Sequence, residues 1–332
     1  MNILVTIPDL PVRQTFFEAP QIQALEALGT VAWNPHPRNF TPEELAERLP
    51  GVDVVVTGWG TPKITGPVLA AADKLRLLAH TGGTVKPYIG EDAYQRGVRA
   101  TSGNDIFAQS VAEGVIGYML AGLREIPRYN NGVKAGHWPD GFYNRGLMYK
   151  KVGLVGYGTI TRHVVEMLKP FRVQLLVYSR YIQQEELDKH GMRQATLEEI
   201  FAECDVVSLH SAMTDANRHM IKAEHVRAMK PGALLVNTAR GGLIDEENVF
   251  PILGEGKVLA VLDVFEQEPL TDGTSPLCKM ENVTMMPHMA GPTIDRRPVV
   301  ASAVLADIAA FAAGRPMAGE VPLDVMQRMS ES

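Results

Sequence analysis

The sequence predicts an α/β protein with two domains, each built on a doubly wound parallel sheet. Short apolar runs typical of buried strands alternate with helical patterns along most of the chain, as expected when helices cover a parallel sheet. The length of 332 residues is well above the roughly 100–200 residues of one domain. We therefore expect two hydrophobic cores rather than one.

The stretch 151–180 has the pattern of the βαβ unit that opens a Rossmann-like, dinucleotide-binding domain. An apolar run leads into Gly156-Tyr157-Gly158, and a helical pattern and a second apolar run follow. Glycines at such a turn let the backbone approach a pyrophosphate at the helix N-terminus, where free N–H groups favour an anion. Thr161 stands where G-x-G-x-x-G has its third glycine, so an ordinary strand-to-helix turn remains the alternative.

Composition narrows the function classes. The net charge of -6 leaves no basic excess, so we expect no nucleic-acid partner. Cys204 and Cys278 are the only cysteines, too few for a disulfide framework or a thiolate zinc site, and we expect no metal. The N-terminus has no basic leader, and no apolar run approaches the roughly 18 residues of a membrane span. These features predict a cytoplasmic protein without a membrane partner.

Residues 1–103 should alternate strands and helices. Thr41 and Glu44 form a capping-box pattern, and Thr65 is placed to cap a further helix. The loop His80–Thr84 contains paired glycines, which either turn the chain or present backbone N–H groups at the carboxyl edge of the sheet. The expected strands are 3–7, 31–33, 52–57 and 75–79, and the expected helices are 20–28, one after Thr41 and one ending at 72.

The segment 104–126 carries the longest helical pattern in the chain. Its apolar residues cover more than one face, so we expect this helix to be buried on several sides. The segment 130–145, rich in glycine and asparagine, is expected to be a connection without a core of its own.

After 180 the alternation of strands and helices resumes. Thr196 and Glu199 form a second capping-box pattern, and Asp245 is placed to cap a later helix. The final helical pattern spans 293–313, and we expect the chain to return to its first domain near Pro287. The other expected strands are 205–209, 233–238 and 258–264, and the other expected helices end at 204, 229 and 253.

Three polar segments in the second half of the chain follow expected strands. Arg240 precedes two glycines, so its guanidinium can reach into a cleft and bind a carboxylate, although a surface ion pair is the alternative. Glu266 and Glu268 follow the next strand, where loop carboxylates are usually only solvated. His288 follows a third, and a lone histidine there is more often structural than catalytic.

Together these residues fit one reaction. Reducing a carbonyl with a nicotinamide hydride requires an acid at the oxygen, and the reverse reaction requires a base. His288 can exchange that proton near neutral pH, and Glu268 can fix its tautomer and favour the imidazolium. Arg240 can hold a substrate carboxylate and so orient the carbonyl carbon.

The segments NTARGGLID, LDVFEQEP and PHMAGPT closely resemble the C-terminal signatures of the D-isomer-specific 2-hydroxyacid dehydrogenase family. VAEGVIGYML resembles its long interdomain helix, VGLVGYGTI its cofactor turn, and DVVSLHSAMTDAN the strand and loop that follow. The chain departs from the family pattern in the substrate loop HTGGTVKP, at Thr161, and at Ser211-Ala212, where the family often has proline.

The resemblance implies a role for each matched residue. Arg240 is similar to the substrate-orienting arginine, Glu268 to the carboxylate that polarises the histidine, and His288 to the acid/base. Gly83 and Thr84 resemble the backbone donors for the substrate carboxylate, with Arg240 as a further substrate contact. The expected cofactor-binding residues are Gly156, Tyr157, Gly158, Thr159, Ile160, Ser179, Arg180, His210, Thr238, Ala239 and Asp263, the last of them near the nicotinamide carboxamide.

The family also implies a domain order and an assembly. Residues 1–103 plus 287–332 would form a discontinuous, flavodoxin-like substrate-binding domain, and 104–286 the dinucleotide-binding Rossmann domain. A homodimer is expected, with the helix after Asn104 at its interface.

Ser179 and Arg180 bear on the choice of cofactor. NAD-binding proteins tend to place Asp or Glu at the end of this second strand, where the carboxylate binds the ribose 2′-OH. A hydroxyl and a guanidinium can instead donate to a 2′-phosphate. NADP(H) is therefore favoured. NAD(H) stays open, because Arg180 can also stack on adenine and because Glu185, Glu186 or another nearby acid can occupy the pocket.

The expected activity is an NAD(P)-dependent oxidoreductase that interconverts a small D-2-hydroxy acid and its 2-oxo acid, with a glyoxylate or hydroxypyruvate reductase favoured. A formate- or phosphite-type dehydrogenase is one alternative on the same fold. A non-enzymatic protein that senses dinucleotides is another.

Overall fold

The computed structural model describes residues 1–271 and 273–330, so the last two residues of the expected substrate-binding range lie outside it. The chain divides into two compact units, one of 1–108 with the C-terminal segment from 292, the other of 109–291. The crossings expected from the sequence fall a few residues earlier, after 103 and before 287. We describe each unit by itself.

The unit of 1–108 and the C-terminal segment contains a five-stranded parallel sheet in the order β2-β1-β3-β4-β5. This is the strand order of flavodoxin-like folds, as expected. The strands are β1 (Asn2–Val5), β2 (Thr30–Trp33), β3 (Val54–Thr57), β4 (Leu77–His80) and β5 (Arg99–Ser102). The helices are α1 (Pro11–Phe16), α2 (Ala19–Glu26), α3 (Pro42–Arg48), α4 (Gly66–Ala70), α5 (Glu91–Gln95), α13 (Arg297–Ala312) and α14 (Leu323–Gln327).

Both faces of this sheet are buried. Successive residues of a strand point to opposite faces, so Leu4 and Val55 belong to one hydrophobic cluster, whereas Val5 and Val56 belong to another. The second cluster is completed by the apolar side of α13, with Val304 among its residues. A sheet with a core on each face explains why its strands read as continuous apolar runs.

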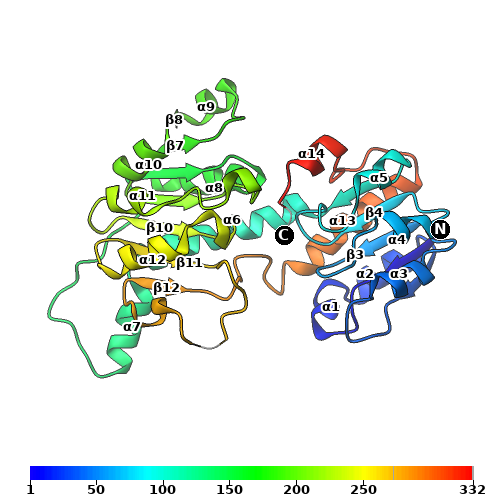
Figure 1. Cartoon of the computed structure of the whole chain (residues 1–332), viewed down its shortest axis with the longest axis horizontal. Helices are drawn as coiled ribbons and strands as arrows, with labels where there is room; N and C mark the ends of the chain where they lie inside the picture. Colours follow the sequence, from blue (N-terminus) through cyan, green and yellow to red (C-terminus); the bar gives the residue numbers. More distant parts are fainter. Residues whose placement is uncertain (272, 331–332) are drawn as a thin grey trace. The chain divides into compact units, whose positions relative to one another are not determined.

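The unit of 109–291 contains a seven-stranded parallel sheet in the order β12-β11-β10-β9-β6-β7-β8, which Figure 1 shows from β12 to β8. Counted from β6, this is the Rossmann order 3-2-1-4-5-6 with one more strand. The strands are β6 (Lys151–Val155), β7 (Gln174–Tyr178), β8 (Arg193–Gln194), β9 (Val206–Leu209), β10 (Leu234–Asn237), β11 (Leu259–Leu262) and β12 (Val283–Met285). The helices are α6 (Asn104–Leu123, entering from the first unit), α7 (Ile126–Lys134), α8 (Thr159–Leu168), α9 (Gln184–His190), α10 (Leu197–Glu203), α11 (Ala223–Ala228) and α12 (Glu246–Gly254).

Helix α6 is buried along much of its length, as its apolar band predicted. Val111, Val115 and Met119 are at most 5% exposed, and Gly122 packs so closely on Leu234 that a Cβ there would lie 2.8 Å from a Leu234 methyl. Among the described residues, α6 alone is long and apolar enough to cross a membrane by length and composition. In this structure 44% of that apolar stretch is buried, and Gly122 packs on Leu234 of β10.

The capping boxes at Thr41 and Thr196 are confirmed, with the hydroxyl and the Glu carboxylate exchanging hydrogen bonds with the backbone in both. Two other expected caps are wrong. The Thr65 hydroxyl donates to Asp92 rather than accepting from its own helix, and the Asp245 carboxylate accepts from the Asn248 side chain. In both cases a polar partner nearby binds the side chain instead of the helix backbone.

The segment expected to be only a connection begins as helix, because α7 extends to Lys134. Large apolar side chains on α7 and the loop after it remain exposed, and Figure 1 shows this part standing out from the rest of its unit. The exposed residues are Ile126, Val133, Trp138, Phe142, Tyr143, Met148 and Tyr149.

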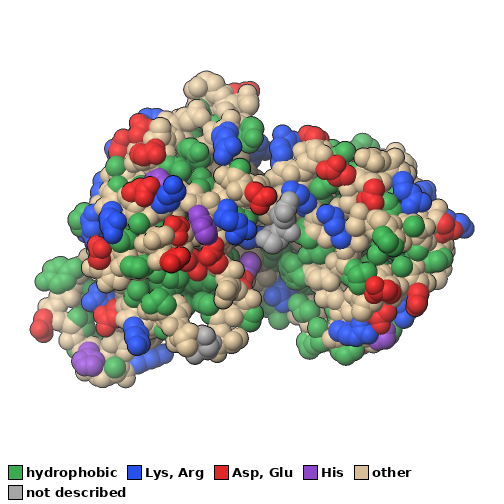
Figure 2. Space-filling view, viewed as in Figure 1, with side chains coloured by type: hydrophobic (Ala, Val, Ile, Leu, Met, Phe, Trp, Pro, Cys, Tyr) green, Lys and Arg blue, Asp and Glu red, His purple; other side chains and the backbone are tan. Residues whose placement is uncertain are grey.

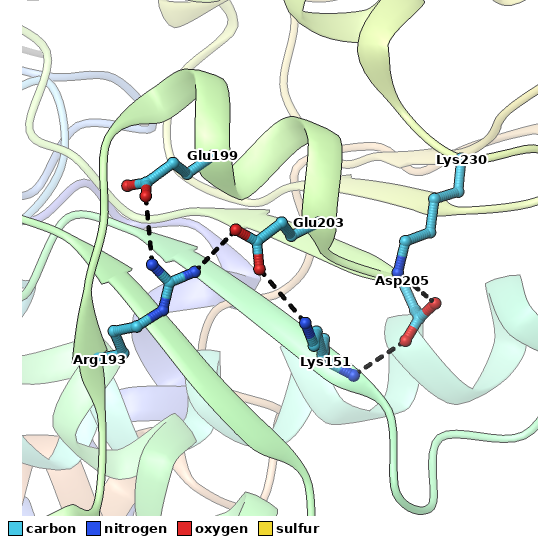
Figure 3. A network of polar contacts seen from close by, with 6 residues as sticks. All are labelled: Lys151, Arg193, Glu199, Glu203, Asp205 and Lys230. Carbon is cyan, nitrogen blue, oxygen red and sulfur yellow. Dashed lines mark hydrogen bonds and ion pairs between the residues drawn. The ribbon is translucent and has the colours of Figure 1, made fainter.

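A network of ion pairs joins β6, β8 and α10 (Figure 3). Arg193 bridges Glu199 and Glu203 at 3.2 and 3.0 Å, while Lys151 contacts Glu203 and, through its backbone N–H, Asp205. Lys151 begins β6 and Asp205 precedes β9, so the part of the network around these two residues lies at the amino ends of the strands, away from the carboxyl ends where ligands bind. Elsewhere, Figure 2 shows acidic and basic side chains interspersed over the visible face.

Candidate active site

The glycine turn of the expected βαβ unit lies between β6 and α8. Gly156 has φ +104°, and a Cβ there would lie 2.6 Å from the backbone nitrogen of Ser211, so both conformation and space require glycine. Gly158 faces open space, and Thr159 is the first residue of α8. The turn therefore presents bare backbone at a helix N-terminus, as an anion site requires.

Thr161, in place of the third glycine, is accommodated inside the unit. Its side chain is fully buried, and its hydroxyl donates to the carbonyl oxygen of Gly156 at 3.0 Å. This hydrogen bond therefore links helix α8 to the glycine turn.

Two buried polar atoms at the sheet edge find no partner among the described residues. They are Nε2 of His210, which follows β9, and Oγ1 of Thr238, which follows β10. Although the whole His210 residue retains some exposure, burial lowers the pKa of its imidazole to about 4, so the ring is neutral at pH 7. Since β9 lies between β6 and β10, both atoms lie at the strand ends next to the glycine turn. A bound dinucleotide fits these groups, because it supplies the polar atoms that they lack.

The end of β7 opens onto a cavity of about 530 Å³ lined by Ser179 and Arg180 together with Gln194–Glu199. Arg180 donates to Asn217 at 3.2 Å. The acidic residues of the lining are Glu198 and Glu199, and neither Glu185 nor Glu186 is among them. Glu186 instead accepts from the Tyr157 hydroxyl at 2.8 Å, and that bond, foremost, lowers the pKa of the Glu186 carboxyl.

His288 and Glu268 form a direct pair. Nδ1 of His288 lies 2.7 Å from Oε2 of Glu268, and the other Glu268 oxygen accepts from the backbone N–H of Phe265 at 2.8 Å. His288 has φ +53° and donates its backbone N–H to the Asp263 carbonyl. With Nδ1 bound to the carboxylate, Nε2 is the ring nitrogen that can exchange a proton with a substrate.

Asp263 holds the backbone around His288. Its buried carboxylate accepts from the N–H groups of Met289 and Ala290 and from the Tyr118 hydroxyl on α6, each at 2.9 Å. Burial, with the neighbouring Asp263 charge, raises the pKa of Tyr118, so its hydroxyl stays protonated as the donor. Sequence reasoning missed Tyr118, since a tyrosine inside an apolar helical band gives no sign of a polar partner.

Arg240 lies directly after β10, where Asn237 shapes the turn. The Asn237 side chain donates to the Arg240 carbonyl at 3.0 Å and accepts from the Ala239 N–H at 3.1 Å. The Arg240 guanidinium donates to the Ala239 carbonyl at 2.7 Å. Gly241 presses against the backbone of Phe265, where a Cβ would come within 1.9 Å, so the structure brings the Arg240 and Glu268 segments together.

Gly83 and Thr84 lie in the first unit, in the loop after β4. The Thr84 hydroxyl donates to the Ser330 carbonyl at 3.0 Å, and a Cβ on Gly83 would lie 3.3 Å from the Asn104 side chain. His80, at the start of this loop, is held in place by its surroundings. It is buried, stacks on Tyr88, and has Nδ1 3.0 Å from the Thr57 hydroxyl.

These features define a class: a two-domain α/β protein whose larger unit binds a dinucleotide and carries a histidine–carboxylate pair. A family model described as D-isomer specific 2-hydroxyacid dehydrogenase, NAD binding domain, matches residues 116–290, more than half of the chain. The chain belongs to the D-isomer-specific 2-hydroxyacid dehydrogenase family, and 116–290 is its NAD-binding domain.

Three curated relatives show what the chain is similar to. D-3-phosphoglycerate dehydrogenase of Methanocaldococcus jannaschii is 35% identical over 88% of this chain, which spans about half (54%) of that longer protein. Hydroxypyruvate reductase of Thermotoga maritima is 34% identical over 76% of this chain and 82% of its own length. Glyoxylate reductase of Thermococcus litoralis is 31% identical over 85% of this chain and 87% of its own length.

Among solved structures, a protein of Thermus thermophilus is similar over 97% of this chain and 100% of its own. The TM-score is 0.80 at 27% sequence identity. The doubly wound architecture expected from the sequence is thus shared by a solved structure over nearly its full length.

Proposed function

We propose that this protein is an NAD(P)-dependent D-2-hydroxyacid dehydrogenase, with the unit of 109–291 holding the nicotinamide cofactor and the unit of 1–108 with the C-terminal segment contributing to substrate binding. The observation that carries the proposal is the pairing of His288 Nδ1 with Glu268 at 2.7 Å. Family membership supports it, because relatives of similar sequence are named as reductases of hydroxypyruvate and glyoxylate.

In the proposed reaction the bound nicotinamide supplies or accepts the hydride at the substrate carbon. His288 gives a proton from Nε2 to the carbonyl oxygen during reduction and takes it back during oxidation. Glu268 holds the imidazole by Nδ1 and stabilises the imidazolium. Arg240 binds the substrate carboxylate and fixes the carbonyl carbon for transfer. Gly83 and Thr84 are the backbone donors that the other unit is proposed to contribute to substrate binding.

The proposed cofactor contacts follow the sheet edge. The turn Gly156–Ile160 receives the pyrophosphate, with Tyr157 directed by its bond to Glu186. His210, Thr238 and Ala239 are proposed to contact the dinucleotide beyond its pyrophosphate. Asp263 acts by holding the backbone of 288–290 beside the nicotinamide.

We propose NADP(H) as the preferred cofactor, with NAD(H) usable. Ser179 and Arg180 both line the cavity at the end of β7, where the ribose 2′ position of a dinucleotide is expected. The Glu186 carboxylate accepts a hydrogen bond from the Tyr157 hydroxyl and does not line this cavity, which supports the preference.

A small 2-oxo acid such as glyoxylate or hydroxypyruvate is the proposed substrate. Initial rates with NADPH and NADH against a panel of 2-oxo acids, formate and phosphite test this. We expect turnover of short 2-oxo acids, faster with NADPH. Turnover of formate or phosphite alone would indicate a different dehydrogenase. Dinucleotide binding without any turnover would indicate a sensing protein.

We also propose a cytoplasmic homodimer. Large apolar side chains of α7 and the following loop are exposed, Trp138 by 78% and Tyr143 by 86%, and a second copy can cover them. This segment begins three residues after α6, the helix expected at the interface. Sedimentation equilibrium at micromolar concentration should show a dimer, and a monomer there would contradict the proposal.

A further inference from the structure

The loop 265–268, which carries Glu268, is held by two carboxylates at adjacent backbone N–H groups. The N–H of Phe265 donates to Glu268 itself at 2.8 Å. The next N–H, that of Glu266, donates to Oε1 of Glu246 at 2.8 Å. Glu246 is the first residue of α12, so a helix start outside the histidine–carboxylate pair anchors the loop that shapes it.

A second contact holds the same loop from another direction. The Glu266 side chain pairs with Nε2 of His219. His219 has φ +51°, a left-handed conformation that is unusual for a residue with a side chain, and its backbone N–H donates to the Gly242 carbonyl at 2.8 Å. His219 therefore links the Glu268 loop to the segment that follows Arg240.

Close packing joins the same two segments. A Cβ on Gly241 would come within 1.9 Å of the Phe265 carbonyl carbon and 2.2 Å of the Glu266 nitrogen. The backbones carrying Arg240 and Glu268 are thus in direct contact. The hydrogen bond of Glu246 and the contacts of His219 hold the same two segments together. Burial raises the pKa of the Glu246 carboxyl, and the Glu266 N–H is the first contact that opposes this rise.

We propose that Glu246 and His219 are positioning residues. They clamp the loop 265–268 against the Arg240 segment and so orient the Glu268 side chain toward His288. This role requires no contact of either residue with substrate. The clamp fixes the distance between the group that binds the carboxylate and the group that orients the acid/base, and small displacements there are costly for turnover. Its catalytic consequence rests on the proposed function, whereas its structural part does not.

The test compares Glu246→Ala, Glu246→Gln and, as a matched control, Glu247→Ala on the exposed side of the same helix start. Hydrogen–deuterium exchange of the peptide containing 265–268 reports on the clamp without any activity. Glu246→Ala should speed exchange of the Glu266 amide about tenfold, because it removes the acceptor of that N–H. Glu246→Gln keeps an acceptor oxygen and should stay within about threefold of the parent, as should Glu247→Ala.

We expect kcat to fall in the variants whose amide exchange becomes faster. In Glu246→Ala, kcat should fall about 10- to 100-fold, while the Kd for NADPH stays unchanged, and Glu246→Gln should restore most of kcat. Unchanged exchange and kcat in Glu246→Ala would overturn the proposal. Equal losses of kcat in Glu246→Gln and Glu246→Ala would overturn it too, because the acceptor oxygen would then not be the cause. If the parent protein reduces no 2-oxo acid, the proposed function fails, but the exchange comparison still decides the clamp.

His219 gives an independent pair of variants should Glu246→Ala not fold. His219→Gln can place an amide nitrogen near the position of Nε2, whereas His219→Ala cannot. Faster exchange of 265–268 in His219→Ala, with recovery in His219→Gln, supports the clamp. Parent-like exchange in His219→Ala contradicts it.

Discussion

At the scale of single residues, His80 shows how burial sets a charge state. Its ring is 1% exposed, stacked on Tyr88 and bonded to the Thr57 hydroxyl. Burial lowers the pKa of His80 to about 3, against the 6.5 of an ordinary histidine. The neutral ring is a structural support under the loop that carries Gly83 and Thr84.

This pKa predicts a specific acid sensitivity. Because the folded pKa is depressed, the unfolded chain binds a proton at His80 that the folded protein does not, so stability is full above pH 6.5 and falls as the pH drops toward 3. Between pH 8 and pH 5 the loss from this one group should be about 2 kcal/mol. Urea denaturation at both pH values, for the parent and His80→Gln, measures it. Equal losses in the two proteins would refute the assignment.

Residues that follow apolar strands could be picked out from the sequence. Arg240, Glu268 and His288 all lie at carboxyl ends of strands, where parallel sheets bind ligands, and the pairing of Glu268 with His288 is present in the structure. Tyr118 and Glu246 could not be found in this way. They act through contacts with Asp263 and Glu266, which are distant in the sequence, and their local sequence carries no trace of those contacts.

At the scale of elements, local chemistry predicted some features and tertiary contacts decided others. The boxes at Thr41 and Thr196 formed because both partners lie within one turn of the chain. Thr65 failed as a cap because Asp92, 27 residues away, binds its hydroxyl. Strand positions were predicted to within two residues for β3 and β4, since a fully buried strand shows as an unbroken apolar run.

The segment 130–145 shows the limit of that approach. Its glycines and polar residues predicted a plain connection, yet α7 continues to Lys134 and carries exposed Ile126 and Val133. Exposed apolar residues give no internal core pattern from which the sequence can place a helix. The proposed dimer would cover them.

At the scale of the whole molecule, the two doubly wound parallel sheets were the most predictable feature. Parallel pairing places every strand's carboxyl end on one edge of its sheet. The choice of substrate was not predictable in the same way, because it depends on loops rather than on the sheets. Family membership and the His288–Glu268 pair lead to one central claim, that His288 exchanges the proton of a nicotinamide-dependent reaction.

The most direct test of that claim is a comparison of the parent protein with His288→Asn in glyoxylate reduction and in NADPH binding. Because the substitution removes the proton donor and leaves the glycine turn intact, kcat should fall by roughly 10²–10⁴, while the Kd for NADPH, measured by fluorescence, stays within about twofold of the parent value. A His288→Asn protein that retains parent-like turnover would contradict the account.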